Sequence, residues 1–330
     1  METAYLVPLR SSVSLDAPAT AYFRSIAREV DELLVVDGSP DEVVEHHRAA
    51  LGPAARVLRP DPSIRCRNGK VQGVLTGLAA TTCEHVVIAD DDVRYDGAAL
   101  RLVTERLGRA EAVCPQNVFD PAPWHARWDT GRILVHRAVG HDMPGTVAVR
   151  RRFVARAGGY DGDVLFENLE LLRTIAAAGG RVDHALDIAV ARVPPSTERF
   201  VGQRVRQAYD EFARPLLLLT WLAVLPSILH AARRVVRPAR RTAGLAELAA
   251  IGGCTILLAE AGRRRAGGRE VFPATAALWA PLWLLERGLC SWIALGARLR
   301  GGARYHGVRF PKAASSPRRL RRRFAEGAGR

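Results

Sequence analysis

Short apolar runs alternate with stretches of helical periodicity over the first 120 residues of the chain. The runs that predict strands are 4–10, 32–39, 55–60, 85–92 and 111–119. The stretches that predict helices are 17–30, 41–50, 69–80 and 98–107. Near-continuous apolar strands separated by helices are typical of a parallel sheet that is covered on both faces. The first part of the sequence therefore predicts an α/β domain.

Three long apolar segments follow residue 214, at 215–231, 244–262 and 271–297. The first has 17 residues without a charge, which is near the lower limit for a membrane-spanning helix. The second carries Glu247 and Glu260 near its ends, and the third contains Glu286 and Arg287. Because buried charges are costly in hydrocarbon, these two segments either span, tilt or lie at the membrane interface. We therefore expect two or three membrane-associated helices.

Charge is distributed unevenly along the chain, whose net charge is +14. Residues 1–231 carry 27 basic and 29 acidic side chains, whereas residues 232–330 carry 21 basic and 5 acidic ones, a net of +16. The near-neutral first part argues against a nucleic-acid-binding protein. The tail sequence SPRRLRRRF (316–324) suits anionic lipid headgroups, and a disordered, soluble tail is the alternative.

The cysteines and the N-terminus indicate where the protein works. Five scattered cysteines without a C-x-x-C pair are typical of a reducing compartment and predict neither a zinc site nor a disulfide framework. The first twelve residues do not resemble a cleavable signal peptide. The loops between the apolar segments are basic, which indicates that much of the chain after residue 214 lies on the cytoplasmic side of the membrane. They do not determine a unique membrane topology. We expect a cell-membrane protein whose first domain is cytoplasmic.

Three consecutive aspartates, Asp90, Asp91 and Asp92, end the apolar run that begins at residue 85. One interpretation is a solvated turn, since aspartates hydrogen-bond to the local backbone where a strand leaves a sheet. The other is a divalent-cation site, because clustered carboxylates repel one another unless a cation or hydrogen bonds offset the repulsion. Asp37 ends another strand at the sheet edge where such folds bind ligands. Alternation along an extended strand puts Asp90 and Asp92 on one side and Asp91 on the other.

The order of several motifs resembles that of family 2 glycosyltransferases with the GT-A fold. The nucleotide-binding half of that family is matched by VVDGSP, NGKVQGVLTGL and VVIADDDV. Its acceptor half is matched by GTVAVRRRFVARAGGYDGDVLFENLELLRTIAAAGGRV, so that the resemblance covers roughly residues 4–213. It implies a GT-A domain with a Rossmann-like, mostly parallel sheet over 1–213, membrane-associated helices over 214–300 and a basic tail over 301–330.

The same resemblance implies roles for residues of the nucleotide-binding half. Asp92 would bind Mg²⁺ or Mn²⁺, and Asp90 would bind the metal or the ribose of a nucleotide-sugar donor. A divalent cation with oxygen ligands neutralises the diphosphate leaving group as a Lewis acid. Nucleotide contacts are implied for Arg10, Asp37 and Lys70. A turn residue is the alternative for Asp37, and a plain surface lysine is the alternative for Lys70.

Inverting members of this family usually take their general base from the aspartate of an E-D pair. Glu167 matches the glutamate here, but Asn168 stands at the aspartate position, and an amide cannot act as a base at neutral pH. We expect Glu167 to be the base, with Glu170 or Asp163 as alternatives. A purely structural role for Glu167 at the start of a helix is the remaining interpretation.

A second motif of the resemblance lies just before the apolar segments. The sequence GQRVRQAYDEF resembles the family signature Q-x-x-R-W through Gln203 and Arg206, with Gln207 in place of tryptophan. The resemblance implies that these residues bind the acceptor or the diphosphate, and an amphipathic surface helix is the alternative. Further along, GARYHGVRF resembles the Y-x-G segment that follows the last membrane helix in lipid-directed members.

The sequence thus predicts a membrane-anchored, metal-dependent, inverting glycosyltransferase. Its partners would be a nucleotide-sugar donor, a lipid-linked or membrane-proximal acceptor and an anionic membrane surface, with no nucleic acid. Because Asn168 and Gln207 depart from the family pattern, a non-catalytic membrane scaffold on a degenerate glycosyltransferase fold is the alternative.

Overall fold

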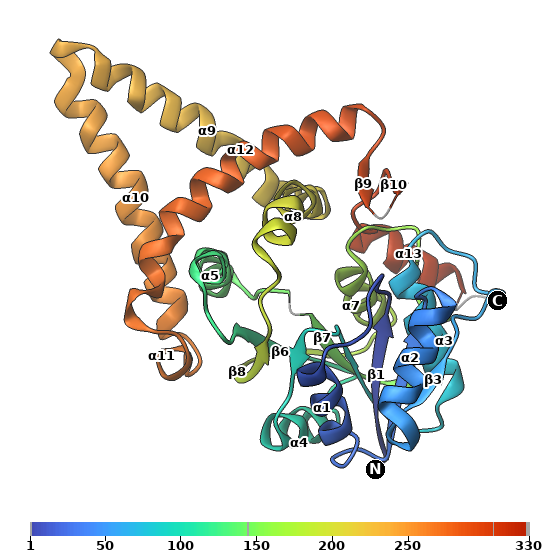
Figure 1. Ribbon diagram of the computed structural model, residues 1–330. Coiled ribbons are helices and arrows are strands. Elements are labelled where there is room, and N and C mark those ends of the chain that lie inside the picture. Colours follow the sequence, from blue (N-terminus) through green and yellow to red (C-terminus); the bar gives the residue numbers. More distant parts are fainter. Residues whose placement is uncertain (1, 144, 306, 328–330) are drawn as a thin grey trace. The chain divides into compact units, whose positions relative to one another are not determined.

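The computed structural model describes residues 2–143, 145–305 and 307–327, which fold into two compact units (Figure 1). The first unit combines Met1–Asn117, Met143–Val193 and Ala314–Arg330, and the second combines Val118–Asp142 and Pro194–Ala313. These units interleave along the chain, whereas the sequence predicts consecutive regions. The extent of the membrane-associated region, 214–300, stays a prediction.

An eight-stranded sheet is the centre of the first unit. Its strands are β1 Thr3–Leu9, β2 Glu32–Asp37, β3 Arg56–Leu58, β4 His85–Ala89, β5 Val93–Arg94, β6 Ala112–Phe119, β7 Thr146–Arg150 and β8 Val182–Arg192, in the order β3-β2-β1-β4-β7-β6-β8-β5. Strands β3, β2, β1 and β4 are parallel, as the pattern predicts. Strand β7 runs antiparallel to β4 and β6, and β8 runs antiparallel to β5. The apolar pattern does not distinguish β6 and β7 from the parallel strands, because most of their residues are also buried.

Helices cover both faces of this sheet. They are α1 Ala17–Ile26, α2 Asp41–Leu51, α3 Gly69–Ala80, α4 Gly97–Arg106, α6 Arg151–Arg156, α7 Glu167–Ala177 and the C-terminal α13 Pro317–Gly327. On β1, Tyr5 and Val7 pack in the cluster of α1 and α4, while Ala4 and Leu6 pack in that of α3 and α7. Successive residues of a strand point to opposite faces, so burial on both faces explains the continuous apolar runs.

The second unit is helical. Its helices are α5 Trp124–Val139, α8 Thr197–Tyr209, α9 Pro215–Val236, α10 Arg241–Arg264, α11 Gly268–Val271 and α12 Ala280–Leu299, followed by the strand pair β9 Ala303–Tyr305 and β10 Val308–Phe310. Short 3₁₀ turns lie at Gly52–Ala54 in the first unit and at Asp210–Ala213, Pro238–Arg240 and Ala274–Trp279 in the second. In the core, the rings of Trp221 and Trp283 meet edge to face with their centroids 5.2 Å apart.

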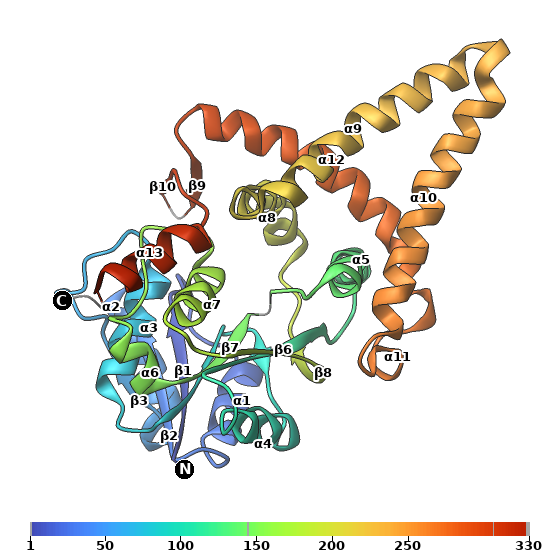
Figure 2. The ribbon, with the colours of Figure 1, turned by 180° about the vertical axis from the view of Figure 1, so that it is seen from behind.

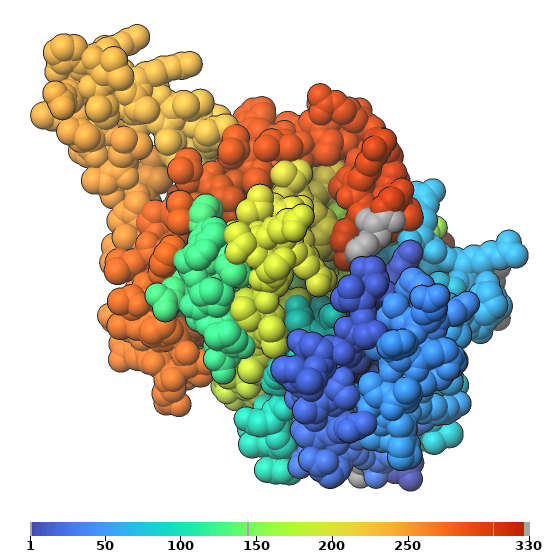
Figure 3. Space-filling model, in the orientation of Figure 1, coloured from blue at the N-terminus to red at the C-terminus, as the bar shows by residue number. Residues whose placement is uncertain are grey.

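Helices α9 and α10 form an apolar hairpin. By length and composition alone, α9 and the stretch Pro238–Arg264 could each cross a membrane, and only 17% of the apolar window of each is buried. The tip of the hairpin, gold in Figure 3, stands clear of the other helices of its unit. No further helix in the described part of the chain meets this test. Much of the third expected segment, 271–297, falls in α12, which buries Trp283 and Ala294 inside the unit.

Buried ion pairs hold α5, α8 and α12 together. Arg204 of α8 lies 2.9 Å from Asp129 of α5 and 3.4 Å from Glu286 of α12, and Arg132 pairs with both Asp129 and Asp142. Burial alone would raise the pKa of Asp129, but Arg132 and Arg204 outweigh it and hold this pKa well below its usual range. Removing one partner would leave an uncompensated buried charge, which makes this network a strong constraint on the packing.

Helix α10 crosses α5 at a glycine. A Cβ atom at Gly262 would overlap the backbone carbonyl oxygen of Leu134, which cannot move without shifting α5. Gly252, in the same helix, has no atom within 4 Å of its Cβ position. The close crossing therefore depends on Gly262 and not on the glycine content of α10 in general.

We expect Gly262→Ala to destabilise the protein by about 1–3 kcal/mol through overpacking. Gly252→Ala, the matched control, should be neutral or should gain up to about 1 kcal/mol of helix propensity. Thermal unfolding of the purified full-length protein measures both. A Tm of the Gly262 variant equal to that of the control would contradict the close crossing.

Candidate active site

The three aspartates form a tight turn between β4 and β5. The N–H of Asp90 donates to the carbonyl of Gly145 (2.9 Å), and the N–H of Val93 donates back to the carbonyl of Asp90 (3.1 Å). All three carboxylates are half-buried at the carboxyl end of β4. The structure thus contains the turn of the first interpretation, at the edge where α/β sheets bind ligands, and the divalent-cation site of the second interpretation stays a prediction.

Lys70 joins this turn to helix α7. The N-cap Asn68 accepts the N–H of Lys70 at its Oδ1 (3.1 Å) and fixes the start of α3. The Nζ of Lys70 lies 2.5 Å from Asp90 Oδ1 and 2.8 Å from Glu167 Oε1. Burial alone would lower the pKa of Lys70, but the two carboxylates outweigh it and raise this pKa. Lys70 therefore stays charged at neutral pH and fixes both carboxylates.

Arg192, the last residue of β8, contacts the other side of the turn. Its Nε and Nη2 lie 3.0 Å from the two carboxylate oxygens of Asp92, and Nη2 lies 3.4 Å from Asp90 Oδ2. A Cβ atom at Gly145 would lie 2.8 Å from Asp90 Oδ2 and 3.0 Å from the guanidinium carbon, so any side chain there would displace the pair. No motif marks Arg192 in the sequence. Only the antiparallel pairing of β8 with β5 brings it here.

Asp37 is wholly buried at the end of β2. Its Oδ1 accepts the N–H of Ser39 (2.9 Å), and its Oδ2 lies 2.6 Å from His47 Nδ1. Because the N–H of Leu15 donates to Nε2 of His47 (3.0 Å), the ring proton is on Nδ1 and is donated to Asp37. Arg10 is exposed after β1. The nucleotide contacts expected for Asp37 and Arg10 stay predictions, and the sequence reasoning missed His47.

The other two base candidates have different surroundings from Glu167. Asp163 is exposed, and its Oδ1 accepts the N–H of Arg67 (2.9 Å). Glu170 is wholly buried and accepts the N–H of Ser315 at Oε2 (2.5 Å). Ser315 lies two residues before the start of α13, which packs along α7 (Figure 2). The structure thus brings Glu167 to Lys70 and uses Glu170 to hold the C-terminal segment.

Gln203 and Arg206 belong to the second unit, on α8. Both are half-buried, and the guanidinium of Arg206 lies 4.8 Å from the ring centroid of Tyr305, as a cation–π pair. Tyr305 and Gly307 belong to the expected Y-x-G segment, whose His306 lies outside the described residues. The acceptor or diphosphate role of Gln203 and Arg206 stays a prediction.

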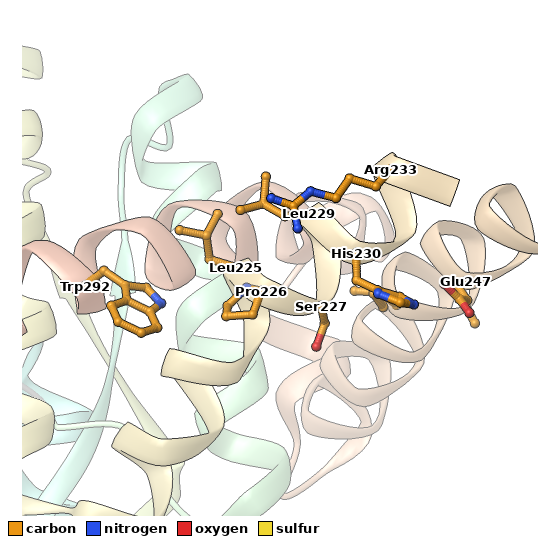
Figure 4. Close-up of a pocket in the computed structure, with 10 residues that line it drawn as sticks. Leu225, Pro226, Ser227, Leu229, His230, Arg233, Glu247 and Trp292 are labelled. Carbon is orange, nitrogen blue, oxygen red and sulfur yellow. The ribbon is translucent and has the colours of Figure 1, made fainter. Parts of the chain in front are cut away.

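A cavity of about 890 Å³ lies between α9 and α10 (Figure 4). It is lined mainly by apolar side chains, with His230, Arg233 and Glu247 among the polar ones. Pro226 has no N–H to bond the carbonyl of Leu222, and Trp292 of α12 donates its Nε1–H to that carbonyl instead (3.0 Å). The cavity contains none of the expected site residues.

The residues around the turn fit a hard divalent cation. Asp90 and Asp92 offer carboxylate oxygens, the ligand type that Mg²⁺ and Mn²⁺ prefer, and Mg²⁺ is usually held by one or two carboxylates together with substrate phosphates. Within the described ranges, no group of three His, Cys, Asp or Glu side chains could hold a metal by itself. A cation here would therefore be completed by ligands from a substrate or from water.

Comparison with known proteins identifies the fold. No protein-family model matches the sequence, and a search of the curated proteins found no match. Among solved structures, the mannosyltransferase PcManGT from Pyrobaculum calidifontis, in complex with GDP-Man and Mn²⁺, is 20% identical with a TM-score of 0.50. That match covers 88% of this chain and 87% of the mannosyltransferase.

A second solved structure is more distant. Glucosyl-3-phosphoglycerate synthase from Mycobacterium tuberculosis, in complex with Mn²⁺ and UDP, is 20% identical with a TM-score of 0.41. The match covers 61% of this chain and 75% of the synthase. The likeness to PcManGT confirms the expected fold class: an α/β GT-A fold followed by a helical C-terminal region.

We expect Glu170→Ala to release the C-terminal segment from α7, because it removes the acceptor of the Ser315 N–H. Leaving a buried N–H without an acceptor costs about 1–3 kcal/mol, so tryptic cleavage within α13 should become about tenfold faster. Limited proteolysis followed by mass spectrometry measures the rate. Glu170→Gln keeps an acceptor oxygen and serves as the matched control, and equal cleavage of wild type and Glu170→Ala would contradict the assignment.

Proposed function

We propose that the protein is a metal-dependent glycosyltransferase that uses a nucleotide-sugar donor. The convergence of Asp90, Asp92, Lys70 and Glu167 at the carboxyl edge of a GT-A sheet carries this proposal. These residues come from the turn after β4, from α3 and from α7, which meet where such folds bind ligands. The mannosyltransferase of the same fold contains GDP-Man and Mn²⁺, which supports the same class of ligands here.

The donor diphosphate would bind at the turn between β4 and β5. Asp92 and Asp90 would hold Mg²⁺ or Mn²⁺, which supplies Lewis-acid neutralisation of the diphosphate leaving group. Lys70, charged at neutral pH, keeps Asp90 and Glu167 in fixed positions and adds positive charge at the same place. Preorganised charges of this kind stabilise the developing charge of a leaving group without reorganisation during the reaction.

Glu167 is the general base in this proposal. A carboxylate oxygen of Glu167 accepts the proton of the acceptor hydroxyl as its oxygen bonds to the anomeric carbon and the bond to the diphosphate breaks, which inverts the configuration. The ion pair with Lys70 orients the carboxylate (2.8 Å). Asp163 is exposed, and Glu170 is buried against Ser315, so neither shares this contact with the metal-binding turn.

We also propose that the enzyme is attached to a membrane and acts on a lipid-linked or membrane-proximal acceptor. Two apolar helices that are long enough to span support attachment. Five exposed arginines of α13 support contact with anionic headgroups, on the cytoplasmic side that the basic loops favour: Arg318, Arg319, Arg321, Arg322 and Arg323.

Binding of a nucleoside diphosphate should require the metal. We expect GDP or UDP to bind the wild-type protein in the presence of Mn²⁺. The affinity should fall at least about tenfold when a chelator removes the metal, or when Asp92→Asn removes the negative charge of a metal-binding side chain. Isothermal titration calorimetry measures this, with Asp187→Asn, an exposed carboxylate of β8, as the control. If no nucleotide binds under any of these conditions, the non-catalytic scaffold replaces the enzyme.

Glu167→Gln should lower turnover by about two to four orders of magnitude, the usual contribution of general-base catalysis. Donor binding should be retained, because the amide oxygen can still accept from Lys70. Single-turnover rates, measured with nucleotide-sugars that carry the nucleoside diphosphate found to bind, provide the measurement, and Asp163→Asn provides the control. Near-normal turnover of Glu167→Gln would show that another carboxylate is the general base.

Attachment through α9 and α10 should resist salt. High salt screens charge interactions, with a Debye length of about 3 Å at 1 M, but does not affect a helix in hydrocarbon. We expect the full chain to stay in the membrane fraction at a salt concentration of about 1 M and to be released by detergent. Replacing the five arginines of α13 with glutamine should leave this behaviour unchanged. Release of the wild type by salt alone would show a peripheral, charge-held enzyme.

A further inference from the structure

Arg192 holds both carboxylates that the proposed metal would need. Its guanidinium donates from two nitrogens to the two oxygens of Asp92, each at 3.0 Å, and approaches Asp90 at 3.4 Å. Bidentate arginine–carboxylate pairs of this geometry are among the stronger ion pairs in proteins. In this position, the guanidinium of Arg192 would compete with a metal for the carboxylate oxygens of Asp92 and Asp90.

Backbone pairing between β8 and β5 brings Arg192 to the turn. Arg192 is paired with Val93 across β8 and β5, and the N–H of Val193 donates to the carbonyl of Asp92 (2.8 Å). Gly145 closes the other side, where a Cβ atom would meet both Asp90 and the guanidinium. Main-chain pairing therefore holds the backbone of Arg192 beside the turn, and the charge interaction holds its side chain on Asp92.

A divalent cation on Asp92 would compete with the guanidinium of Arg192. Both carry positive charge, both need the oxygens of the same carboxylate, and Lys70 already contributes a third positive charge at Asp90. A diphosphate changes this balance, because its oxygens match the planar guanidinium fork as well as a carboxylate does. A bound diphosphate would offer Arg192 a second partner and would leave Asp92 available to a metal.

We propose that Arg192 couples metal binding to donor binding by exchanging Asp92 for the diphosphate of the nucleotide-sugar. This inference rests on the proposed function and adds a donor-positioning residue to it. In the free protein the guanidinium occupies Asp92, so the metal alone binds weakly. When the donor arrives, the guanidinium turns to the diphosphate and the metal takes the released carboxylate. By linkage, the metal then strengthens nucleotide binding by the same factor as the nucleotide strengthens metal binding.

A purely structural salt bridge between β8 and β5 predicts a different outcome. In that case, loss of Arg192 would lower stability but leave the affinity for the metal alone unchanged or weaker. The affinity for Mn²⁺ without nucleotide therefore separates the two roles, and it does not depend on catalytic activity.

The test is a titration of Mn²⁺ followed by electron paramagnetic resonance of the free ion, on the full-length protein with and without GDP or UDP. Arg192→Gln should bind Mn²⁺ alone about tenfold tighter or more than wild type, since a neighbouring positive charge is removed. The same variant should lose most of the tightening that nucleotide gives the wild type. Arg192→Lys keeps the charge and should retain the weak binding of Mn²⁺ alone.

Arg106→Ala is the matched control. Arg106 belongs to α4 and pairs with Asp187, which lies on β8 like Arg192 but away from the turn. Equal affinity of wild type and Arg192→Gln for Mn²⁺ alone, or equal tightening by nucleotide, would overturn the role of Arg192 while leaving the proposed function intact. If no form binds Mn²⁺, even with nucleotide, the metal-dependent function fails and this inference fails with it. Thermal unfolding of each variant confirms that it is folded.

Discussion

Three like charges at the end of one strand require positive partners, and the first unit is organised around supplying them. Lys70 comes from the start of α3 and Arg192 from the end of β8, 122 residues apart in the numbering, and both reach the carboxylates that follow β4. Lys70 also holds Glu167, which begins α7. The positive charges that offset the repulsion among the aspartates thus come from segments that are distant in the sequence and that the fold brings together.

The part of the fold that depends on local pattern could be predicted from the sequence. The parallel strands, the limits of α3 and the aspartates at the sheet edge follow from periodicity and strand-end chemistry. Arg192 and His47 could not be predicted, because antiparallel pairing and burial against a distant strand end give them their partners. Glu170 looks like a base candidate in the sequence, and only the return of the chain 145 residues later shows that Ser315 occupies it.

The second unit combines an apolar core with a buried charged network and an exposed apolar hairpin. Its interior contains the charged network around Asp129 and Arg204, while the α9–α10 hairpin exposes large aliphatic side chains such as Leu216 and Leu257. In water, such a surface would be a liability and such an interior a desolvation cost. A hydrocarbon environment around the hairpin removes the first problem, and this supports the proposed attachment to a membrane.

The C-terminal segment held by Glu170 also determines when the first unit can complete its folding during synthesis. A ribosome releases the strands and helices of the first unit, including α7, well before residues 314–330, which complete that unit. All of Pro194–Ala313, with both apolar helices, is synthesised in between. Domains generally fold as they emerge, but the face of α7 that carries Glu170 stays open to water until the last helix arrives. The finished first unit is therefore a late product of synthesis, formed only after the chain has made its apolar hairpin.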